Sequence, residues 1–387
     1  MSQRVIVVGG GIIGASTAYY GAKAGMDVIL LESDYIAAGT SSACDQGILL
    51  QTKKPGPTLN LAIESSKMYE QLEEELGADI EYKKGGGLII MENELEKEMV
   101  EKHADQLRQF GIKIDSLSTK EVRAKQPELG EHLLGATWCA DDAKVNSMKA
   151  SFELVNAAER LGAEVRYGAK VTRILTEGDR VIGVEVNKEK IYADKVILTT
   201  GVWTAPLVED LGVELPIIPR RGHILVTEKL PPTLHSNILS GAYIAAKSKG
   251  NEVDPNNPAG VGLVIGQVAS GNILIGGSRE FVGFKQGTSD AIVRAISTAA
   301  AQAFPKLADT RIIRAFIGFR PFTADGLPII GAISQLPGLY ICAGHEGDGI
   351  ALAPVSGRVI TEIVAGKETF MDMSPFSPDR FCKVQQV

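Results

Sequence analysis

The sequence predicts an α/β fold built on a parallel sheet. The first indication is a strand, a glycine turn, a helix and a second strand within residues 4–32. The second is a series of short strands over residues 162–201, the last of which is apolar. The third is a strand, a glycine turn and a helix over residues 338–366. Strands that alternate with helices in this way favour a parallel sheet covered by helices.

The first of these segments has the spacing of a dinucleotide-binding unit. The continuous β-branched run RVIVVG is typical of a strand buried on both faces, and Gly9, Gly11 and Gly14 follow it as G-x-G-x-x-G. Gly9 permits a tight turn, Gly11 lets a pyrophosphate approach the backbone, and Gly14 lets the helix pack close to the strand. Glu32, which closes the second strand, can accept hydrogen bonds from an adenosine ribose. The alternative, a glycine turn without a ligand, is disfavoured by the strand, helix and terminal Glu together.

The segment after the second strand favours FAD over NAD. In a simple NAD dehydrogenase, further βα repeats would follow directly. A long polar loop over residues 37–57 follows here instead, and loops of this length are usually functional. Such a loop can wrap an extended cofactor. Thr40, Ser41 and Ser42 offer hydroxyls to phosphate or ribityl oxygens, and Gly47 lets the backbone reach a flavin ring.

Two later segments converge on the same site. Residues 162–201 are typical of a small antiparallel meander laid on the parallel sheet, since their strands are separated by Gly-Asp and Asn-Lys turns. In residues 338–366 the glycines Gly344, Gly347 and Gly349 precede a helix, whose N-terminus could face an anion or a carbonyl. Ordinary turn chemistry explains these three glycines equally well.

Arg320 raises a question of pairing. It stands between Phe319 and Pro321 in an otherwise apolar segment, and a guanidinium is almost never buried without a partner. The planar fork of an arginine suits the carboxylate of a bound substrate. The alternative is an ion pair within the protein, for example with Asp325.

Bulk properties narrow the class of protein. A chain of 387 residues suits two domains, and a net charge of -7 argues against a nucleic-acid surface. No apolar run reaches the roughly eighteen residues of a membrane helix, and the N-terminal apolar segment lacks the features of a signal peptide. No zinc site or disulfide framework, and no other metal site, is expected, because the four cysteines are far apart without a C-x-x-C pair. They are Cys44, Cys139, Cys342 and Cys382.

Motifs over nearly the whole chain carry a family resemblance. They are VVGGGIIGAS, Glu32, GTSSACDQG, VILTTGVWT, PRRGHILVTE, GFRPFTADGLPIIG and AGHEGDGIALAPVSG. Together they resemble the FAD-dependent amino acid and amine oxidoreductases typified by D-amino-acid oxidase, and more closely glycine oxidase and sarcosine oxidase. The stretches GNILIGGSREFVGF and GHEGDGI resemble the catalytic subunits of multi-subunit enzymes, namely D-hydroxyproline dehydrogenase, hydrogen cyanide synthase and opine oxidases.

The resemblance implies a discontinuous, Rossmann-like FAD-binding domain and a second, substrate-binding domain. The substrate domain would hold a mixed sheet with helices on its outer face. In agreement, RGHILVTE and GNILIGGSRE are typical of strands, and SDAIVRAISTAAAQAF is typical of a helix. The expected boundaries are 1–76, 140–216 and 316–375 for the FAD domain, 77–139 and 217–315 for the substrate domain, and 376–387 for a C-terminal tail.

The resemblance also implies the site residues. Arg320 would bind the substrate carboxylate, and His345 could sit near the flavin or the substrate amine and tune its protonation. His223 is expected in the core or at an interface. The residues expected to bind FAD are Gly9, Gly11, Ile12, Ile13, Gly14, Glu32, Ser33, Thr40, Ser41, Ser42, Gln46, Gly47, Val171, Thr200, Gly201, Trp203, Gly344, Glu346, Gly347, Gly349 and Ile350.

Two departures from the family pattern are informative. Sarcosine oxidases that attach flavin covalently have a cysteine where this chain has Gly318, so FAD should be bound noncovalently. Glycine oxidase has a tyrosine that assists the arginine, and Val264 takes that place here. Glycine is therefore a less favoured substrate.

The sequence predicts an FAD-dependent enzyme that oxidises the C–N bond of a small amino acid or secondary amine, such as D-hydroxyproline or D-proline, by hydride transfer to flavin N5. We expect a catalytic subunit that passes electrons to partner subunits or another acceptor, in an oligomer, in the cytoplasm or at a membrane through a partner. The alternative is a stand-alone glycine, sarcosine or D-amino-acid oxidase that produces hydrogen peroxide. A catalytically silent assembly subunit or an FAD-dependent tRNA-modifying protein is disfavoured, because Arg320 is present and a basic groove is not indicated.

Overall fold

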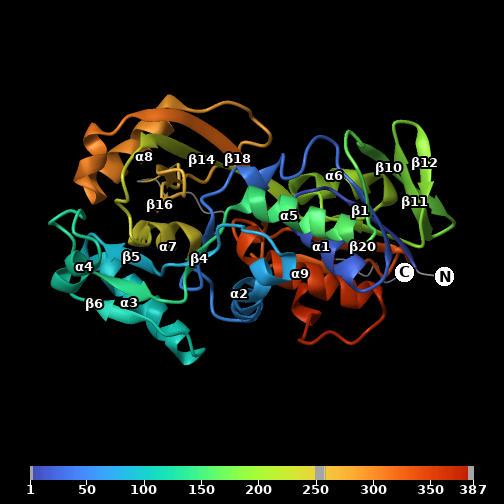
Figure 1. The fold of residues 1–387 in the computed structure, drawn as a ribbon, viewed down its shortest axis with the longest axis horizontal. Coiled ribbons are helices and arrows are strands. Elements are labelled where there is room, and N and C mark those ends of the chain that lie inside the picture. Colours follow the sequence, from blue (N-terminus) through green and yellow to red (C-terminus); the bar gives the residue numbers. More distant parts are fainter. Residues whose placement is uncertain (1–2, 249–256, 258, 382–387) are drawn as a thin grey trace.

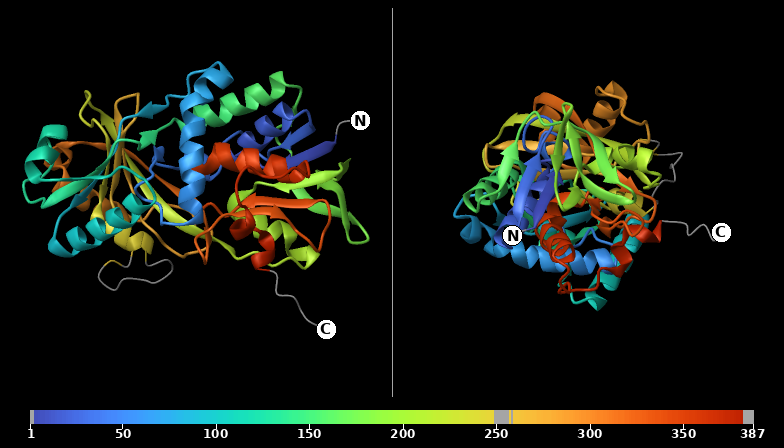
Figure 2. Two further views of the ribbon diagram at one scale, coloured as in Figure 1. Left: turned by 90° about the horizontal axis from the view of Figure 1, so that it is seen from below. Right: turned by 90° about the vertical axis from the view of Figure 1, so that its right-hand side faces the viewer.

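The computed structural model describes residues 3–248, 257 and 259–381. The chain forms an elongated molecule with two halves, each built around one large sheet (Figure 1). Both ends of the described chain lie in the same half of the molecule (Figures 1 and 2). Helix α2 (Pro57–Leu76) lies across the junction between the halves (Figure 2, left). In the described part of the chain, no helix is both long enough and apolar enough to cross a membrane.

The first half contains a six-stranded sheet in the order β19-β20-β13-β1-β2-β9. Its strands are parallel except for β19, which pairs antiparallel with β20. This confirms the parallel sheet that the sequence predicts. The strands are β1 (Arg4–Val8), β2 (Asp27–Leu31), β9 (Glu164–Arg166), β13 (Lys195–Leu198), β19 (Ile329–Ala332) and β20 (Leu339–Ala343).

Both faces of this sheet are covered, which explains the continuous apolar runs of β1 and β2. Val5 and Val7 belong to a core that contains residues of several helices, whereas the alternate residues Ile6 and Val8 pack with the antiparallel meander on the opposite face. The elements that cover the sheet are the helices α1 (Ile12–Lys23), α5 (Ser147–Arg160) and α9 (Gly349–Val364), the meander strands β10 (Val171–Glu177), β11 (Arg180–Val186) and β12 (Glu189–Tyr192), and the short helix α6 (Thr204–Val208).

The second half contains an eight-stranded sheet in the order β18-β14-β17-β16-β15-β5-β7-β6. It is mixed, as expected, because β5 and β15 run parallel while the other pairs are antiparallel. Its strands are β5 (Gly87–Met91), β6 (Asp115–Leu117), β7 (Gly135–Cys139), β14 (Ile217–Lys229), β15 (Asn237–Ser240), β16 (Val264–Gln267), β17 (Asn272–Gly276) and β18 (Ile312–Thr323).

Helices cover both faces of the second sheet, whereas the sequence prediction placed them on the outer face alone. Leu88 and Ile90 of β5 share a core with α4 (Thr119–Lys125) and α8 (Asp290–Ala303). The alternate residues Ile89 and Met91 are apolar as well, and their core includes residues of two further helices. Both faces of β5 are therefore apolar, and helices have to cover the sheet on both sides. These two helices are α3 (Glu94–Gln109) and α7 (Gly241–Ser248).

Two long strands, β14 and β18, connect the halves. They pair over most of their length, so each supports the other as they leave the second sheet. At one end of β14, Ile217 packs in the core with the meander, and further along Leu225 packs in the core with α8. A small sheet of β3 (Gly47–Ile48), β8 (Ala143–Lys144) and β4 (Lys83–Lys84) is the fourth sheet of the described residues.

Candidate active site

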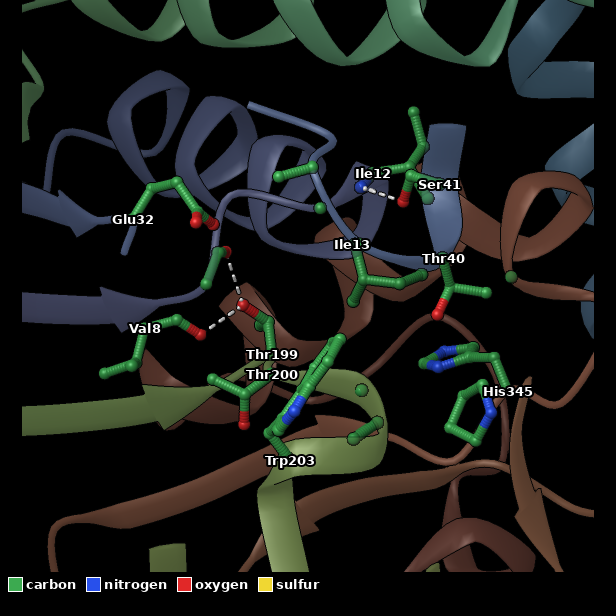
Figure 3. A pocket seen from close by; sticks show the side chains of 18 of the residues that line it. Val8, Ile12, Ile13, Glu32, Thr40, Ser41, Thr199, Thr200, Trp203 and His345 are labelled. Carbon is green, nitrogen blue, oxygen red and sulfur yellow. Dashed lines mark hydrogen bonds between the residues drawn. The ribbon is translucent and has the colours of Figure 1, made fainter. Parts of the chain in front are cut away.

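A cavity of about 800 Å³ lies at the carboxyl ends of the parallel strands in the first sheet. Val8, Leu31 and Ala343, the last residues of β1, β2 and β20, line it together with the starts of α1 and α9. Open α/β sheets bind ligands at this edge, where N–H groups at helix N-termini face the crevice. Figure 3 shows the cavity, with Glu32 and His345 on opposite sides of the view.

The structure brings most of the predicted site residues together around this cavity. Arg320 and His345 line it, and the predicted FAD-binding residues that line it are Gly9, Gly11, Ile12, Ile13, Glu32, Ser33, Thr40, Ser41, Val171, Thr200, Gly201, Trp203, Glu346, Gly347, Gly349 and Ile350. Five predicted residues do not line the cavity, namely Gly14, Ser42, Gln46, Gly47 and Gly344.

The glycine turn after β1 has the geometry that its sequence predicts. Gly9 has a φ of +101°, which favours glycine. A Cβ at Gly14 would lie 1.8 Å from the carbonyl oxygen of Gly9, so this glycine lets α1 pack against the turn although it does not line the cavity. Gly11 is the N-cap of α1 and provides no side-chain cap. The Ile12 amide donates to Ser41 Oγ at 2.9 Å (Figure 3), which joins the turn to the long loop after β2.

Glu32 is held firmly at the end of β2. Its Oε2 accepts a hydrogen bond from the Gly10 amide at 2.6 Å, and its Oε1 accepts from Ser33 Oγ at 3.0 Å and the Asp34 amide at 2.8 Å. Glu32 as a whole is only 7% exposed, yet it lines the cavity. A carboxylate offers about four acceptor sites, so capacity remains for a hydroxyl of a bound ligand.

The loop after β2 contributes fewer hydroxyls than predicted. Thr40 and Ser41 line the cavity, but Thr40 Oγ1 donates to the Phe319 carbonyl at 2.6 Å. Ser42 is directed elsewhere, because its Oγ donates to the Gly39 carbonyl at 3.2 Å. Gly47 lies in β3, where it pairs with β8. The sequence showed which loop would reach the site, but not which of its side chains would turn inward.

Thr199 and Cys44 line the cavity without having been predicted. Thr199 Oγ1 lies 2.7 Å from the Val8 carbonyl oxygen and 2.9 Å from that of Gly9 (Figure 3), so it fixes the turn to the neighbouring strand. Thr199 could have been predicted from the sequence, because it directly precedes Thr200, which was expected to bind FAD. Burial raises the pKa of the Cys44 thiol to about 11, which keeps it in the thiol form.

The turn between β20 and α9 places His345 in the cavity wall. Its Nε2 lies 3.0 Å from Ser356 Oγ of α9. Burial lowers the pKa of His345 to about 4, so the ring is neutral near pH 7. The next residue, Glu346, forms an ion pair with Arg220 of β14, and its carboxylate is therefore engaged by the protein itself.

Arg320 lines the cavity from β18, and its Nη1 donates to the Ser278 carbonyl at 2.9 Å. Glycines make room for it, because a Cβ at Gly222 would lie 2.3 Å from Nη1. The alternative pairing with Asp325 is wrong, since that carboxylate binds Arg380 at 2.8 Å. Among the described residues, no carboxylate lies within ion-pair distance of Arg320.

His223 lies in the core, as expected, and is fully buried. Its Nε2 accepts from the Ser289 amide at 3.1 Å, so Nδ1 carries the proton and can donate to Ser278 Oγ at 3.0 Å. The carbonyl of the same Ser278 accepts a hydrogen bond from Arg320. His223 therefore helps to hold Ser278 in place beside the arginine, and it does not line the cavity.

Val264 is buried in an apolar cluster that includes Leu239 and Ile244. Tyr243 of α7 packs against the same cluster. A tyrosine therefore lies near this position after all, although it comes from a helix. Periodicity alone could not reveal it, because the approach of α7 to β16 depends on the tertiary fold.

The fold and the cavity define a flavin-dependent oxidoreductase. The chain belongs to the FAD dependent oxidoreductase family (DAO), whose sequence profile matches residues 4–363. FAD is accordingly its cofactor. The strand-end cavity, the glycine turn and the retained carboxylate of Glu32 fit this cofactor.

Three similar proteins illustrate the relationship. Glycine oxidase from Pseudomonas aeruginosa is 29% identical, over 98% of this chain and 99% of its own length. The hydrogen cyanide synthase subunit HcnC from Pseudomonas aeruginosa is 24% identical, over 97% of this chain and 96% of its own. The crystal structure of glycine oxidase from Geobacillus kaustophilus has a TM-score of 0.87 at 26% identity, and the match covers 98% of this chain and 99% of that one.

Proposed function

We propose that this enzyme oxidises the C–N bond of a small amino acid or secondary amine, with ring amines such as D-proline and D-hydroxyproline as the first substrates to test. The observation that carries the proposal is Arg320. Its guanidinium lines the cofactor cavity, has one donor tied to Ser278, and has no carboxylate partner among the described residues. A substrate carboxylate would satisfy the remaining donors of this fork.

Different residues around the cavity would bind the cofactor and the substrate. When bound, FAD supplies the acceptor for the hydride that leaves the substrate carbon, and the substrate becomes an imine. Arg320 would hold the carboxylate and so orient the C–H bond. The glycine turn and Glu32 would hold the adenosine and phosphate end of the cofactor. His345 is neutral, so it adds no positive charge that would oppose the loss of a proton from the substrate amine.

Substitution of Arg320 tests whether this residue binds the substrate carboxylate. Arg320→Lys and Arg320→Ala should lower kcat/KM for carboxylated amines by roughly 2–5 kcal/mol of transition-state stabilisation while FAD content stays normal. Arg314 is an exposed arginine on the same strand, and Arg314→Lys is the matched control. Normal turnover by the Arg320 variants would show that another group binds the carboxylate.

For the electron acceptor, we propose a partner subunit or another carrier rather than oxygen. The support is the stretch GNILIGGSREFVGF together with the similarity to a protein named as a subunit. Substrate-reduced enzyme should reoxidise slowly in air and quickly with an artificial dye, and enzyme isolated from its source should bring other polypeptides with it. Rapid, stoichiometric peroxide formation by the isolated chain would contradict this proposal.

A stand-alone oxidase is the second candidate, and the relationship to glycine oxidase over nearly the full length of both chains favours it. This candidate requires glycine or sarcosine to reduce the flavin, with oxygen as the acceptor. Anaerobic mixing with glycine, sarcosine, D-proline and D-hydroxyproline, followed by admission of air, separates the two candidates. Bleaching of the flavin reports the substrate, and the rate of recovery in air reports the acceptor.

A further inference from the structure

The guanidinium of Arg279, three residues beyond β17, is a half-buried cation without a hydrogen-bonding partner in the described part of the chain. Its Nε is completely buried and makes no hydrogen bond. The guanidinium lies over the ring of Tyr243, with 4.4 Å between Cζ and the ring centroid. A cation–π contact offsets part of the desolvation cost but leaves the N–H donors unused.

Arg279 lies at the same junction as Arg320. The residue before it, Ser278, contributes the carbonyl that binds Arg320 Nη1. Burial lowers the pKa of Arg279, and the nearby charge of Arg320 lowers it further. Tyr243, over whose ring the Arg279 guanidinium lies, belongs to α7, and α7 also carries Lys247, which binds Asp348 in the turn before α9. Arg279 does not line the cofactor cavity, but it follows directly on the residue whose carbonyl holds Arg320, so the two arginines are neighbours at the edge of that cavity.

None of the described carboxylates near these two arginines forms an ion pair with either of them. Asp348 lies 2.8 Å from the Lys53 ammonium and 2.9 Å from that of Lys247. Glu346 pairs with Arg220. Asp45 Oδ1 accepts a hydrogen bond from the Gly47 amide, and Asp45 lines the cofactor cavity. Two guanidinium groups thus remain for which the described residues provide no carboxylate within ion-pair distance.

We propose that Arg279 binds a second acidic group of the substrate, so that the preferred substrates carry two carboxylates around the amine. This inference rests on the proposed function, in which Arg320 binds the first carboxylate. Two arginine forks, each bidentate to one carboxylate, would hold a diacid at both ends and orient the C–H bond between them. The substrate class is an iminodicarboxylic acid or an acidic amino acid.

Pairs of substrates of similar shape test this proposal. N-ethylglycine and iminodiacetate differ in the second carboxylate, as do D-norvaline and D-glutamate. In anaerobic flavin reduction by the complete holoenzyme, we expect the diacid of at least one pair to have a kcat/KM about tenfold or more above that of its monoacid. Arg279→Met should remove this advantage, with a loss of roughly a hundredfold for the diacid and less than about threefold for the monoacid.

Binding without turnover provides a second readout. The dissociation constants of glutarate and pentanoate, measured by their perturbation of the flavin spectrum, should favour glutarate in the wild-type enzyme and lose that preference in Arg279→Met. Arg279→Lys keeps the charge but not the fork, and should retain part of the preference. Arg294→Met, on the exposed face of α8, is the control and should change neither constant.

Each failure has a separate meaning. Equal kcat/KM values for monoacids and diacids in the wild-type enzyme would overturn the proposal that Arg279 binds a second carboxylate. Equal losses of kcat/KM for both classes in Arg279→Met would overturn it as well. Reduced stability or flavin content in Arg279→Lys, with the diacid preference unchanged, would also overturn it in favour of a structural role. If Arg320→Lys left the monoacids unaffected, the proposed function itself would fail instead.

Discussion

The Lys247 ammonium lies 2.9 Å from Asp348 Oδ2 and thereby joins α7 of the second half to the turn before α9 of the first. Lys53, whose side chain is 2% exposed, binds the other oxygen of the same carboxylate. Burial alone would raise the pKa of Asp348, but the two lysines more than offset that effect and hold it well below its usual range. The junction between the halves therefore contains a charged cluster that depends on one carboxylate.

Asp348→Asn should weaken this junction strongly. It leaves the buried Lys53 and the partly buried Lys247 without a counter-charge, and breaking a buried pair in this way costs about 3–5 kcal/mol. Thermal unfolding, followed by the release of flavin fluorescence, should show a clearly lower midpoint. Lys247→Met is the control, because the Lys53–Asp348 pair survives in it and the loss should be smaller. Equal midpoints for both variants and the wild type would contradict a stabilising role.

His345 should make stability depend on pH. Burial lowers its pKa from 6.5 to about 4, so between these values the unfolded chain binds a proton that the folded protein does not. Folding stability attributable to His345 is fully present above pH 6.5 and falls as the pH decreases, by up to about 1.4 kcal/mol per unit. His345→Gln should therefore lose less stability than the wild type between about pH 7 and about pH 4.5, as measured by thermal unfolding. Parallel curves would show that His345 is not buried as a neutral ring.

Glu32→Lys should weaken FAD binding. The substitution removes an acceptor at the end of β2, deprives the Gly10 amide of its partner and adds a positive charge near the turn. Titration of the apoprotein with FAD measures the affinity. Lys170→Glu changes the charge of another cavity residue, which lies between β9 and β10, and serves as the comparison. An unchanged affinity for Glu32→Lys would show that Glu32 does not contact the cofactor.

FAD should be released intact by acid precipitation. Gly318 stands where covalent relatives have a cysteine, and a Cβ there would lie 2.9 Å from Ala43. The backbone of the loop therefore occupies the space that a side chain would need. The flavin should appear in the supernatant with the mass of FAD. Yellow colour retained by the washed precipitate would contradict noncovalent binding and direct attention to Cys44 and Cys342, which line the cavity.

Much of the first half of the molecule, which contains the strand-end cavity, was predictable from the sequence. The glycine turn, the helix after it and Glu32 are local features, because strand, turn and helix each follow from residues close together in the chain. The meander and the second glycine turn were predictable for the same reason. The alternating cores of β1, in which Val5 and Val7 face helices while Ile6 and Val8 face the meander, follow from a continuous apolar run.

The arrangement at the junction was decided by the tertiary structure alone. Arg279, Tyr243, Lys53 and Asp348 carry no local pattern, since their significance depends on the approach of segments far apart in the chain. Arg320 could be singled out because an arginine within an apolar segment needs a partner, yet only the fold shows that Asp325 is taken by Arg380. Local sequence determined where a dinucleotide could bind, whereas long-range packing determined which charged side chains line the cavity and which are neutralised by the protein.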